Sequence, residues 1–204
     1  MTLSEEVRAE TSPPALDTKS PVLATERLIL RRLRLADAES LASLANDRRV
    51  AENTARIPHP YTVADAVSFV TAVTGPESIE TVFVATLPDG DILGLCGFGG
   101  SQEEGPELGY WFGAPYWGQG YTTEAVRAVV DYAFTECEHD VLLAGARVTN
   151  AASRRVLEKC GFQWTGVRLQ RIRALASSVP VDQFRLKRHI WAALKSWGPM
   201  RRVV

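Results

Sequence analysis

The segment 106–137 constrains the fold more than any other part of the chain. Residues 106–112 have the pattern of a strand, and apolar residues then recur at helical spacing across 126–137. Gly118 and Gly120 lie between the strand and the helix. This succession of strand, glycine-containing turn and helix predicts a domain of mixed α/β (α+β) class.

The rest of the chain predicts further strands and helices around this segment. Thr62 and Asp65 have the spacing of a capping box, which indicates that a helix begins there, and Asp37 is a candidate cap for an earlier one. In chain order we expect a strand at 27–35, a helix around 41–45, a helix after 62, a hairpin across 81–100, a strand at 141–148, a short helix at 150–161, and strands at 163–169 and 181–187.

The composition predicts one folded domain behind a disordered tail. Residues 1–23 contain Pro13, Pro14 and Pro21 and show no apolar period, so we expect them to be disordered. Residues 24–204 then form a single domain, whose size allows a sizeable core.

Cysteine and histidine usage, together with the lack of a long apolar run, narrows the functional class. The three cysteines are too few and too scattered for a disulfide framework, which favours a cytoplasmic protein. No run of about 18 apolar residues predicts a membrane span. His139 and His189 have no partner at metal-ligand spacing, so no metal site is expected.

The sign of the charge changes along the chain. Residues 1–140 hold 10 Lys and Arg against 22 Asp and Glu, whereas residues 141–204 hold 13 against 2. The basic part fits a polyanionic partner, and it fits ordinary solvated side chains equally well. A nucleic-acid binder is the least favoured class, because no known motif accompanies Arg168, Arg171 and Arg173 and no stacking aromatics are interleaved with them.

The glycine-containing turn has the character of an anion site. A helix N-terminus offers unpaired N–H groups and the positive end of the helix dipole, and Gly118 and Gly120 let a phosphate approach the backbone. A dinucleotide fingerprint would need glycine at Thr123, and a Walker loop would need Gly-Lys-Ser/Thr; neither is present. Gly-x-Gly also occurs in ordinary turns, so the spacing alone leaves both interpretations open.

Two longer segments, ELGYWFGAPYWGQGYTTEAV and VTNAASRRVLEKCGF, resemble the two signatures of the GNAT N-acetyltransferase superfamily. They are most similar to the branch that contains the ribosomal-protein N-terminal acetyltransferases, as are ATERLILRRL and PHPYT, so the resemblance covers residues 24–190 approximately. It implies a mixed, mostly antiparallel sheet of about seven strands, flanked by about four helices and splayed between the fourth and fifth strands. It also implies transfer of acetyl from acetyl-CoA to a primary amine on a protein N-terminus, a lysine or a small molecule, by direct attack on the thioester.

The resemblance also implies a set of cofactor-binding residues. Pro115 stands where the superfamily pattern prefers Arg or Gln, but the expected contacts are made by backbone amides and so do not need that side chain. The amides of the turn would hold the pyrophosphate: Trp117, Gly118, Gln119, Gly120, Tyr121 and Thr122. The preceding strand would flank the pantetheine through Leu108, Tyr110, Trp111 and Phe112. The second signature would add Asn150, Ser153 and Arg154, with Arg154 near the 3'-phosphate, although Asn150 is equally a plain helix cap and Arg154 a plain surface residue.

Catalysis of amide formation requires a proton acceptor, because only a neutral amine attacks a thioester. Glu107 is the first candidate, Glu103 and Glu104 are alternatives, and all three could instead be surface carboxylates. The N–H of Tyr110 or Trp111 is expected to stabilise the oxyanion. Many superfamily members place a tyrosine acid at the position of Leu157, and here Ser153 is the expected replacement, as a hydrogen-bond donor near the sulfur.

The acceptor side is less clearly marked. His59 and Tyr61 stand where the branch has acceptor contacts, although a histidine beside prolines is often structural. A non-catalytic acyl-CoA-binding sensor or regulatory module is the alternative function, because Leu157 replaces the acid. A homodimer is possible, and a ribosome-bound acceptor is the one case in which nucleic acid would be near.

Overall fold

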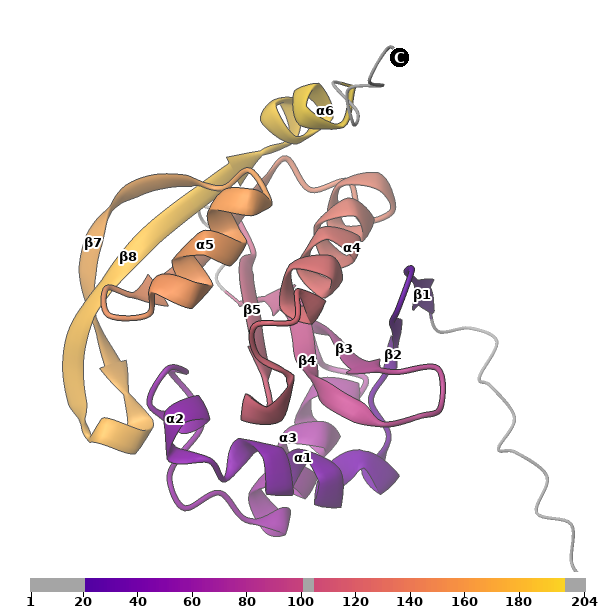
Figure 1. Ribbon diagram of the computed structural model, residues 1–204, viewed down its shortest axis with the longest axis vertical. Coiled ribbons are helices and arrows are strands. Elements are labelled where there is room, and N and C mark those ends of the chain that lie inside the picture. The colour runs from indigo at the N-terminus through magenta and orange to yellow at the C-terminus, as the bar shows by residue number, and fades with distance from the viewer. Residues whose placement is uncertain (1–20, 101–104, 197–204) are drawn as a thin grey trace, which may run out of the picture.

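The computed structural model describes residues 21–100 and 105–196, which form one eight-stranded sheet with helices on both faces (Figure 1). The strands are β1 (Leu23–Ala24), β2 (Ile29–Arg32), β3 (Thr81–Thr86), β4 (Ile92–Gly99), β5 (Glu107–Phe112), β6 (Val141–Arg147), β7 (Gln163–Ile172) and β8 (Ser177–Lys187). The α-helices are α1 (Ala38–Ala45), α2 (Arg48–Ala51), α3 (Val63–Thr74), α4 (Tyr121–Thr135), α5 (Ala151–Lys159) and α6 (Arg188–Ser196). Three 3-10 turns are η1 (Leu35–Asp37), η2 (Ala114–Tyr116) and η3 (Arg173–Leu175).

The sheet has the order β1-β2-β3-β4-β5-β6-β8-β7, and β5 with β6 is its parallel pair among antiparallel neighbours. This confirms the mixed, mostly antiparallel sheet. The strand count exceeds the expected seven because Leu23 and Ala24 pair with Leu30 and Ile29 as a short β1. Within the described residues the α-helices also exceed the expected four, because α2 is a single turn and α6 follows β8.

The chain is already part of the sheet at Leu23, the last residue of the predicted tail. Residues 1–20 of that prediction lie outside the described residues, as do Glu103 and Glu104. None of the described helices has the length and apolar character needed to cross a bilayer.

Local sequence signals explain where most helices begin. The capping box at α3 is complete: Thr62 N–H donates to Asp65 Oδ2 over 2.9 Å, and Asp65 N–H donates to Thr62 Oγ1 over 3.2 Å. Asp37 precedes α1 but does not cap it, because its carboxylate is buried and accepts two hydrogen bonds from the Arg31 guanidinium, at 2.9 and 2.8 Å. The same carboxylate also accepts the Arg34 N–H over 2.8 Å, so Asp37 serves the start of η1 rather than that of α1.

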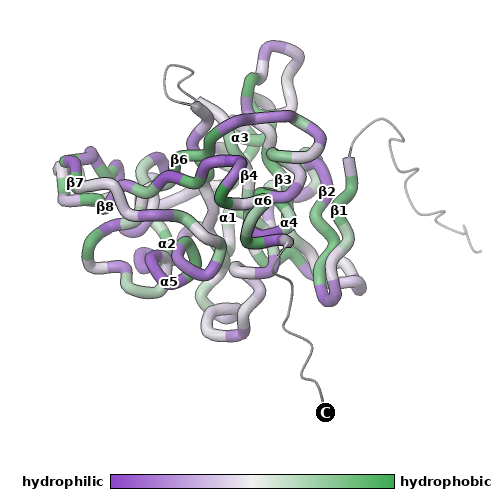
Figure 2. Tube along the Cα trace, turned by 90° about the horizontal axis from the view of Figure 1, so that it is seen from above, coloured by the Kyte–Doolittle hydropathy of each residue, from purple (hydrophilic) through white to green (hydrophobic). Residues whose placement is uncertain are grey.

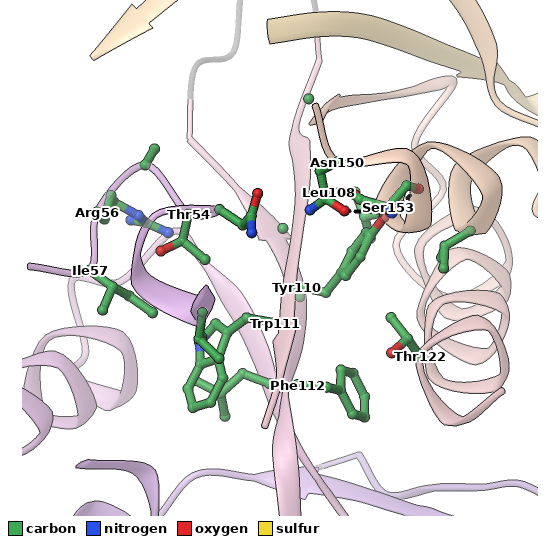
Figure 3. A pocket seen from close by; sticks show the side chains of 18 of the residues that line it. Thr54, Arg56, Ile57, Leu108, Tyr110, Trp111, Phe112, Thr122, Asn150 and Ser153 are labelled. Atoms are coloured by element: carbon green, nitrogen blue, oxygen red, sulfur yellow. Dashed lines mark hydrogen bonds between the residues drawn. The ribbon is translucent and has the colours of Figure 1, made fainter. Parts of the chain in front are cut away.

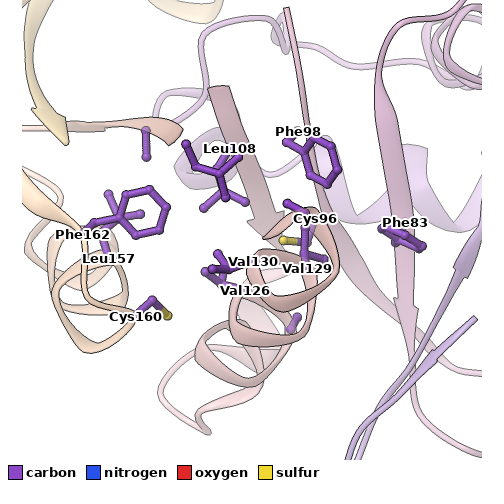
Figure 4. Packing of buried hydrophobic residues seen from close by; sticks show 14 of the residues in the cluster. Phe83, Cys96, Phe98, Leu108, Val126, Val129, Val130, Leu157, Cys160 and Phe162 are labelled. Atoms are coloured by element: carbon purple, nitrogen blue, oxygen red, sulfur yellow. The ribbon is translucent and has the colours of Figure 1, made fainter. Parts of the chain in front are cut away.

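The core confirms the helical pattern from Val126 to Phe134, but α4 ends at Thr135, so the last predicted position, Cys137, lies beyond the helix. Val126, Val129 and Val130 of α4 are buried against β3, β4 and β5, where Figure 4 shows them beside Cys96 and Leu108. A second, smaller cluster packs α1 and α3 on the other face of the sheet. In Figure 2 the trace is green along much of β1 and β2, and more hydrophilic colours lie around α5.

The sheet opens between β5 and β6. The two strands pair only where Glu107 lies opposite Leu143 and Leu108 lies opposite Ala144, and from there to Phe112 β5 is paired with β4 alone. This is the expected splay, found between the fifth and sixth strands because β1 adds one to the count. The edge of β5 beyond Leu108 is therefore free of a neighbouring strand on the side of β6.

Candidate active site

A cavity of about 1200 Å³ opens at this splay. Its walls come from β5, the start of α4, α5 and the segment that follows α2, and Figure 3 shows labelled side chains on both sides of β5. Binding cavities for small molecules and cofactors commonly occupy roughly 300–1,000 Å³. The cavity can therefore hold a large cofactor together with part of a second substrate.

The glycine-containing turn lies at one end of the cavity. Gly118 and Gly120 both have left-handed backbones, with φ of 77° and 84°, and Gly120 occupies the cap position of α4. Within the described residues, no acceptor is recorded for the N–H groups of 118–123, whereas Trp117 N–H donates to Ala114 O over 3.3 Å. The free amides thus begin one residue later than expected, because η2 uses the amide of Trp117. Anion binding by these amides stays a prediction.

Side chains around the turn hold it in place. The Trp117 indole donates to Phe112 O over 2.7 Å, and the Gln119 amide donates to Pro115 O over 3.0 Å. Arg27 lies 4.6 Å from the centre of the Tyr121 ring. The side chains of Gln119 and Tyr121 are therefore occupied in holding the turn, and neither residue is among those that line the cavity.

The backbone of β5 presents alternate residues to the splay. Gly113 N–H donates to Leu93 O over 2.8 Å, toward β4. In an antiparallel pair the N–H and C=O of one residue point to the same side, and successive residues alternate. The backbone of Trp111 therefore faces β4, whereas the N–H of Tyr110 faces the open edge. Of the two candidate oxyanion donors, Tyr110 is the one whose amide is free to reach a ligand there.

The side chains of β5 divide between the two faces of the sheet. Leu108 and Phe112 belong to the core cluster under α4, and Trp111 packs with the cluster formed by α1 and α3. Figure 3 shows Trp111 on the side of Ile57 and Phe112 on the side of α4. The side chain of Glu107, four residues before Trp111, is accordingly on the Trp111 face. The cavity thus has a cofactor side and an acceptor side, with β5 between them.

The Glu107 carboxylate lines the cavity and has an unexpected partner. Its Oε2 atom lies 3.4 Å from Arg168 Nη2, and its side chain remains 42% exposed. A carboxylate that is open to water and bound to a single guanidinium at this distance is available to a substrate ammonium. The pair joins β5 to β7, which no local pattern in the sequence indicates.

The second signature contributes Asn150 and Ser153 to the cavity. Asn150 Oδ1 accepts from Ser153 N–H over 3.1 Å, so Asn150 is a helix cap as well as a lining residue. Ser153 Oγ lies 2.8 Å from the phenol oxygen of Tyr110. Leu157 is fully buried in the core, so the position that matches the family's tyrosine does not reach the cavity.

Arg154 departs from the expected role. Its Nη1 atom lies 3.1 Å from Asp182 Oδ2, on the buried strand β8, and Arg154 is not among the lining residues. Arg155 and Lys159 line the cavity instead. Residues four apart share a helix face, whereas adjacent residues lie about 100° apart. The spacing of Arg155 and Lys159 could have indicated this pair.

The acceptor side is formed largely by residues that the sequence did not indicate. Tyr61 lines the cavity and its partial burial raises its pKa, whereas His59 is exposed and is not a lining residue. The segment after α2 is tied across the cavity, since Arg147 Nη1 donates to Glu52 O over 2.7 Å and Arg173 N–H donates to Ala55 O over 3.1 Å. Distant pairings of this kind leave no mark in a single sequence.

None of the three cysteines lines the cavity. Burial raises the pKa of Cys96, and it raises the pKa of Cys160 to about 11. Both thiols therefore remain protonated near neutral pH, which favours direct transfer over a covalent thiol route. No cluster of three metal-ligating side chains occurs in the part of the chain that the structure describes.

Comparison with known proteins identifies the family. The sequence model of the family described as "Acetyltransferase (GNAT) domain" matches residues 27–163 of this chain. "Uncharacterized N-acetyltransferase p20" of Bacillus licheniformis is 28% identical over 174 residues, covering 83% of this chain and 98% of the relative. "Putative ribosomal N-acetyltransferase YdaF" of Bacillus subtilis is 35% identical over 78 residues, covering 37% of this chain and 43% of the relative.

Solved structures share the fold. The GNAT-family acetyltransferase of Bacillus anthracis has a TM-score of 0.72 at 23% identity, covering 83% of this chain and 99% of that one. Mycobacterium smegmatis RimJ in complex with CoA-disulfide has a TM-score of 0.70 at 19% identity, covering 86% and 94%. Together with the matched domain model, which spans more than half of the chain, these findings show that the protein belongs to the GNAT acetyltransferase family and is an N-acetyltransferase.

Proposed function

We propose that this N-acetyltransferase uses acetyl-CoA and transfers its acetyl group directly to a primary amine. The observation that carries the proposal is the row of free amides at 118–123, placed at the end of a cavity that runs along the unpaired edge of β5. Such a row at a helix N-terminus is suited to a diphosphate. Relatives of the same fold have been solved with acetyl-CoA or CoA bound, among them the microcin C7 self-immunity acetyltransferase MccE and RimL.

The residues present fit this cofactor. The amides of 118–122 hold its diphosphate, and Arg155 and Lys159 supply positive charge on the same wall of the cavity. The open edge of β5 offers the C=O of Tyr110 to an amide N–H of the pantetheine, and it leaves the N–H of Tyr110 for the acyl group. The cofactor supplies an activated acetyl group as a thioester, and the chain supplies its position and the handling of protons.

Each catalytic residue has one task in this proposal. Glu107 accepts a proton from the acceptor's ammonium group, leaving a neutral amine to attack the acyl carbon. The Tyr110 N–H stabilises the negative charge that develops on the acyl oxygen. Ser153 donates a hydrogen bond to the sulfur as the carbon–sulfur bond breaks. The demand on Ser153 is modest, since a thiol with a pKa of about 8.5 leaves readily as the thiolate.

An α-amine on a protein N-terminus is the acceptor we propose first, ahead of lysine and small-molecule amines. An α-amine has a pKa of about 8 against about 10.4 for lysine, so much more of it is neutral near pH 7. This suits a site whose proton acceptor is a half-exposed carboxylate shared with Arg168. The partial match to YdaF, a relative whose name refers to ribosomal N-acetylation, favours the same class.

A release assay with defined amines tests the function. The protein is incubated with acetyl-CoA and peptides that begin with Ala or Ser, a lysine peptide whose N-terminus is blocked, or spermidine. Free thiol and the mass of each acceptor are then measured. We expect amine-dependent thiol release and one added acetyl group on the α-amine peptides. Tight CoA binding without amine-dependent release from any acceptor would instead indicate a sensor module and overturn the proposal.

A further inference from the structure

Two hydroxyl groups meet at the wall of the cavity, one from β5 and one from α5. The phenol oxygen of Tyr110 lies 2.8 Å from Ser153 Oγ and 3.2 Å from the carbonyl oxygen of the same serine. Both residues line the cavity, and Figure 3 shows their side chains in contact. In the described part of the chain, the hydrogen bonds recorded for the Tyr110 phenol therefore all go to a single residue.

The protons of this pair decide which hydroxyl can serve a ligand. Each hydroxyl has one proton to donate and can also accept. If Tyr110 donates to Ser153 Oγ, the serine keeps its own proton for a third group. Burial, as the largest cause, raises the pKa of Tyr110, so the phenol keeps its proton at all physiological pH values. Tyr110 therefore always has one proton to donate. The Ser153 carbonyl oxygen and Ser153 Oγ both lie within reach of it, and we assign the proton to Oγ because that contact is the shorter, at 2.8 Å against 3.2 Å.

We propose that Tyr110 is a positioning residue, which donates to Ser153 Oγ and thereby directs the serine proton toward the sulfur of CoA. The inference rests on the proposed function, because the sulfur lies near Ser153 only if the cofactor occupies the splay. Tyr110 does not itself lose a proton. The electron pair of the broken carbon–sulfur bond goes to sulfur, Ser153 stabilises the thiolate by a hydrogen bond, and the final proton comes from water.

Because Leu157 is buried, the residue at this position cannot donate a hydrogen bond to the sulfur. That position belongs to the apolar core, and a side chain there does not face the cavity. The donor must therefore come from the first turn of α5, where a short serine side chain can rotate among three rotamers. A second hydroxyl from β5 selects one of them. Neither sequence signature indicates that a tyrosine on β5 positions this serine.

The thiol pKa of bound CoA tests the pair without relying on turnover. It is measured from the ultraviolet absorbance of the thiolate during a pH titration of each CoA complex. Because a hydrogen-bond donor favours the thiolate, we expect Tyr110→Phe and Ser153→Ala to raise this pKa by about 0.5–1 unit. Tyr132→Phe is the matched control, since Tyr132 packs 5.5 Å from the Phe83 ring and does not line the cavity, and it should leave the thiol pKa unchanged.

Kinetics separate a positioning role from a structural one. We expect Tyr110→Phe to lower kcat by about threefold to tenfold with an unchanged KM for acetyl-CoA. The double variant should be no slower than Ser153→Ala, because the two residues act through one hydrogen bond. Unchanged kcat and thiol pKa in Tyr110→Phe would overturn the proposal. The proposal would also be overturned if Tyr110→Phe lowered kcat more than Ser153→Ala does and the two losses added in the double variant. Tyr110 itself would then be the donor.

The outcomes remain distinguishable from those of the proposed function. If the unmodified protein binds CoA but acetylates no amine, the proposed function fails, and the thiol titration still decides whether the pair acts on the sulfur. If Tyr110→Phe does not fold, Ser153→Ala carries the test. An unchanged thiol pKa in that variant overturns the inference, because Ser153 would then make no hydrogen bond to the sulfur for Tyr110 to direct.

Discussion

Arg27 and Glu124 join the start of the sheet to the first turn of α4. Their side chains form an ion pair of 2.7 Å, and Arg27 Nη1 also donates to Gln119 O over 2.9 Å. Arg27 thereby holds the turn through the Gln119 carbonyl, and within the described residues the amides of 118–123 remain without a protein acceptor. A residue in the first folded segment thus supports the shape of the cofactor site.

Removal of Arg27 should weaken cofactor binding more than it slows the chemical step. Arg27→Ala releases the Gln119 carbonyl and leaves Glu124, an anion, unpaired beside the diphosphate site. We expect the KM for acetyl-CoA to rise about threefold to tenfold, with kcat nearly unchanged. Lys195→Ala is the control, since it removes an ion pair of 2.9 Å with Asp131 on α6 and α4, away from the turn. A fall in kcat without a change in KM would contradict this role.

The same ion pair should contribute stability that depends on pH. Partial burial acts to raise the pKa of Glu124, but hydrogen bonds from Thr25 and Arg27 outweigh it, so the pKa lies below its ordinary value of 4.5. A folded-state pKa below the unfolded value means that the contribution is present above 4.5 and disappears as the pH falls through the folded value. The free energy of unfolding is compared for the wild type and Glu124→Gln between about pH 7 and pH 3. Their difference should shrink toward the acid end, and a constant difference would refute the assignment.

Substitution of Gly120 by a bulky acidic residue should weaken cofactor binding strongly. At φ of 84° a side chain is strained, and an added Cβ would stand 3.3 Å from Arg27 Nη2. A left-handed backbone at a non-glycine residue costs about 1–2 kcal/mol of stability. Gly120→Glu adds a negative charge as well, so calorimetry should show CoA affinity reduced by at least about a hundredfold.

Gly90→Ala provides the matched control for Gly120. Gly90 has φ of 102° in the turn between β3 and β4, with open space around an added Cβ. The Gly90→Ala variant should lose about as much stability as the Gly120→Glu variant but retain its affinity for CoA. If Gly120→Glu still bound CoA tightly, the turn would not be the diphosphate site.

Loss of the Glu107 carboxylate should slow the reaction in a pH-dependent manner. We expect Glu107→Gln to lower kcat by about a hundredfold or more near neutral pH, because no group then accepts the ammonium proton. The deficit should narrow at alkaline pH, where the acceptor amine becomes neutral by itself. Glu158→Gln, on the exposed face of α5, should behave as the unmodified protein. A deficit that is the same at every pH would exclude Glu107 as the proton acceptor.

The adjacent arginines of α5 should separate stability from binding. Arg154→Ala leaves the buried Asp182 carboxylate without its cation, and we expect a loss of about 1–2 kcal/mol in denaturant unfolding, reduced by the partial exposure of Arg154. Arg155→Ala should leave stability nearly unchanged and raise the KM for acetyl-CoA with a reduced dependence on salt. If Arg154→Ala instead raised the KM for acetyl-CoA and Arg155→Ala instead lowered the stability, Arg154 would be the phosphate contact.

Local patterns predicted the parts of the fold that depend on neighbouring residues. The period of α4, the Thr62 capping box and the Asn150 cap each express an interaction within a few residues, and all three are present. The single-turn α2 was missed because a helix of Arg48–Ala51 has too few residues to show a period. The cap role of Asp37 was lost to Arg31, a partner on another element.

In the site, too, local features could be predicted from the sequence and long-range contacts could not. The turn with Gly118 and Gly120 could be recognised from sequence because its backbone geometry depends on the glycines themselves. The contacts of Glu107 with Arg168 and of Tyr110 with Ser153 join residues separated by 61 and 43 positions. Only the folded sheet brings them together, so the sequence could indicate the residue types but not the pairs.

The central claim, that the amides of 118–122 bind a diphosphate, is tested most directly by nuclear magnetic resonance of the backbone amides during titration with CoA and, separately, with pantetheine. CoA should shift the signals of 118–122 strongly, whereas pantetheine, which lacks the diphosphate, should shift only signals along β5. If CoA binds while those five amides keep their signals in place, the diphosphate lies elsewhere and the proposed site is wrong.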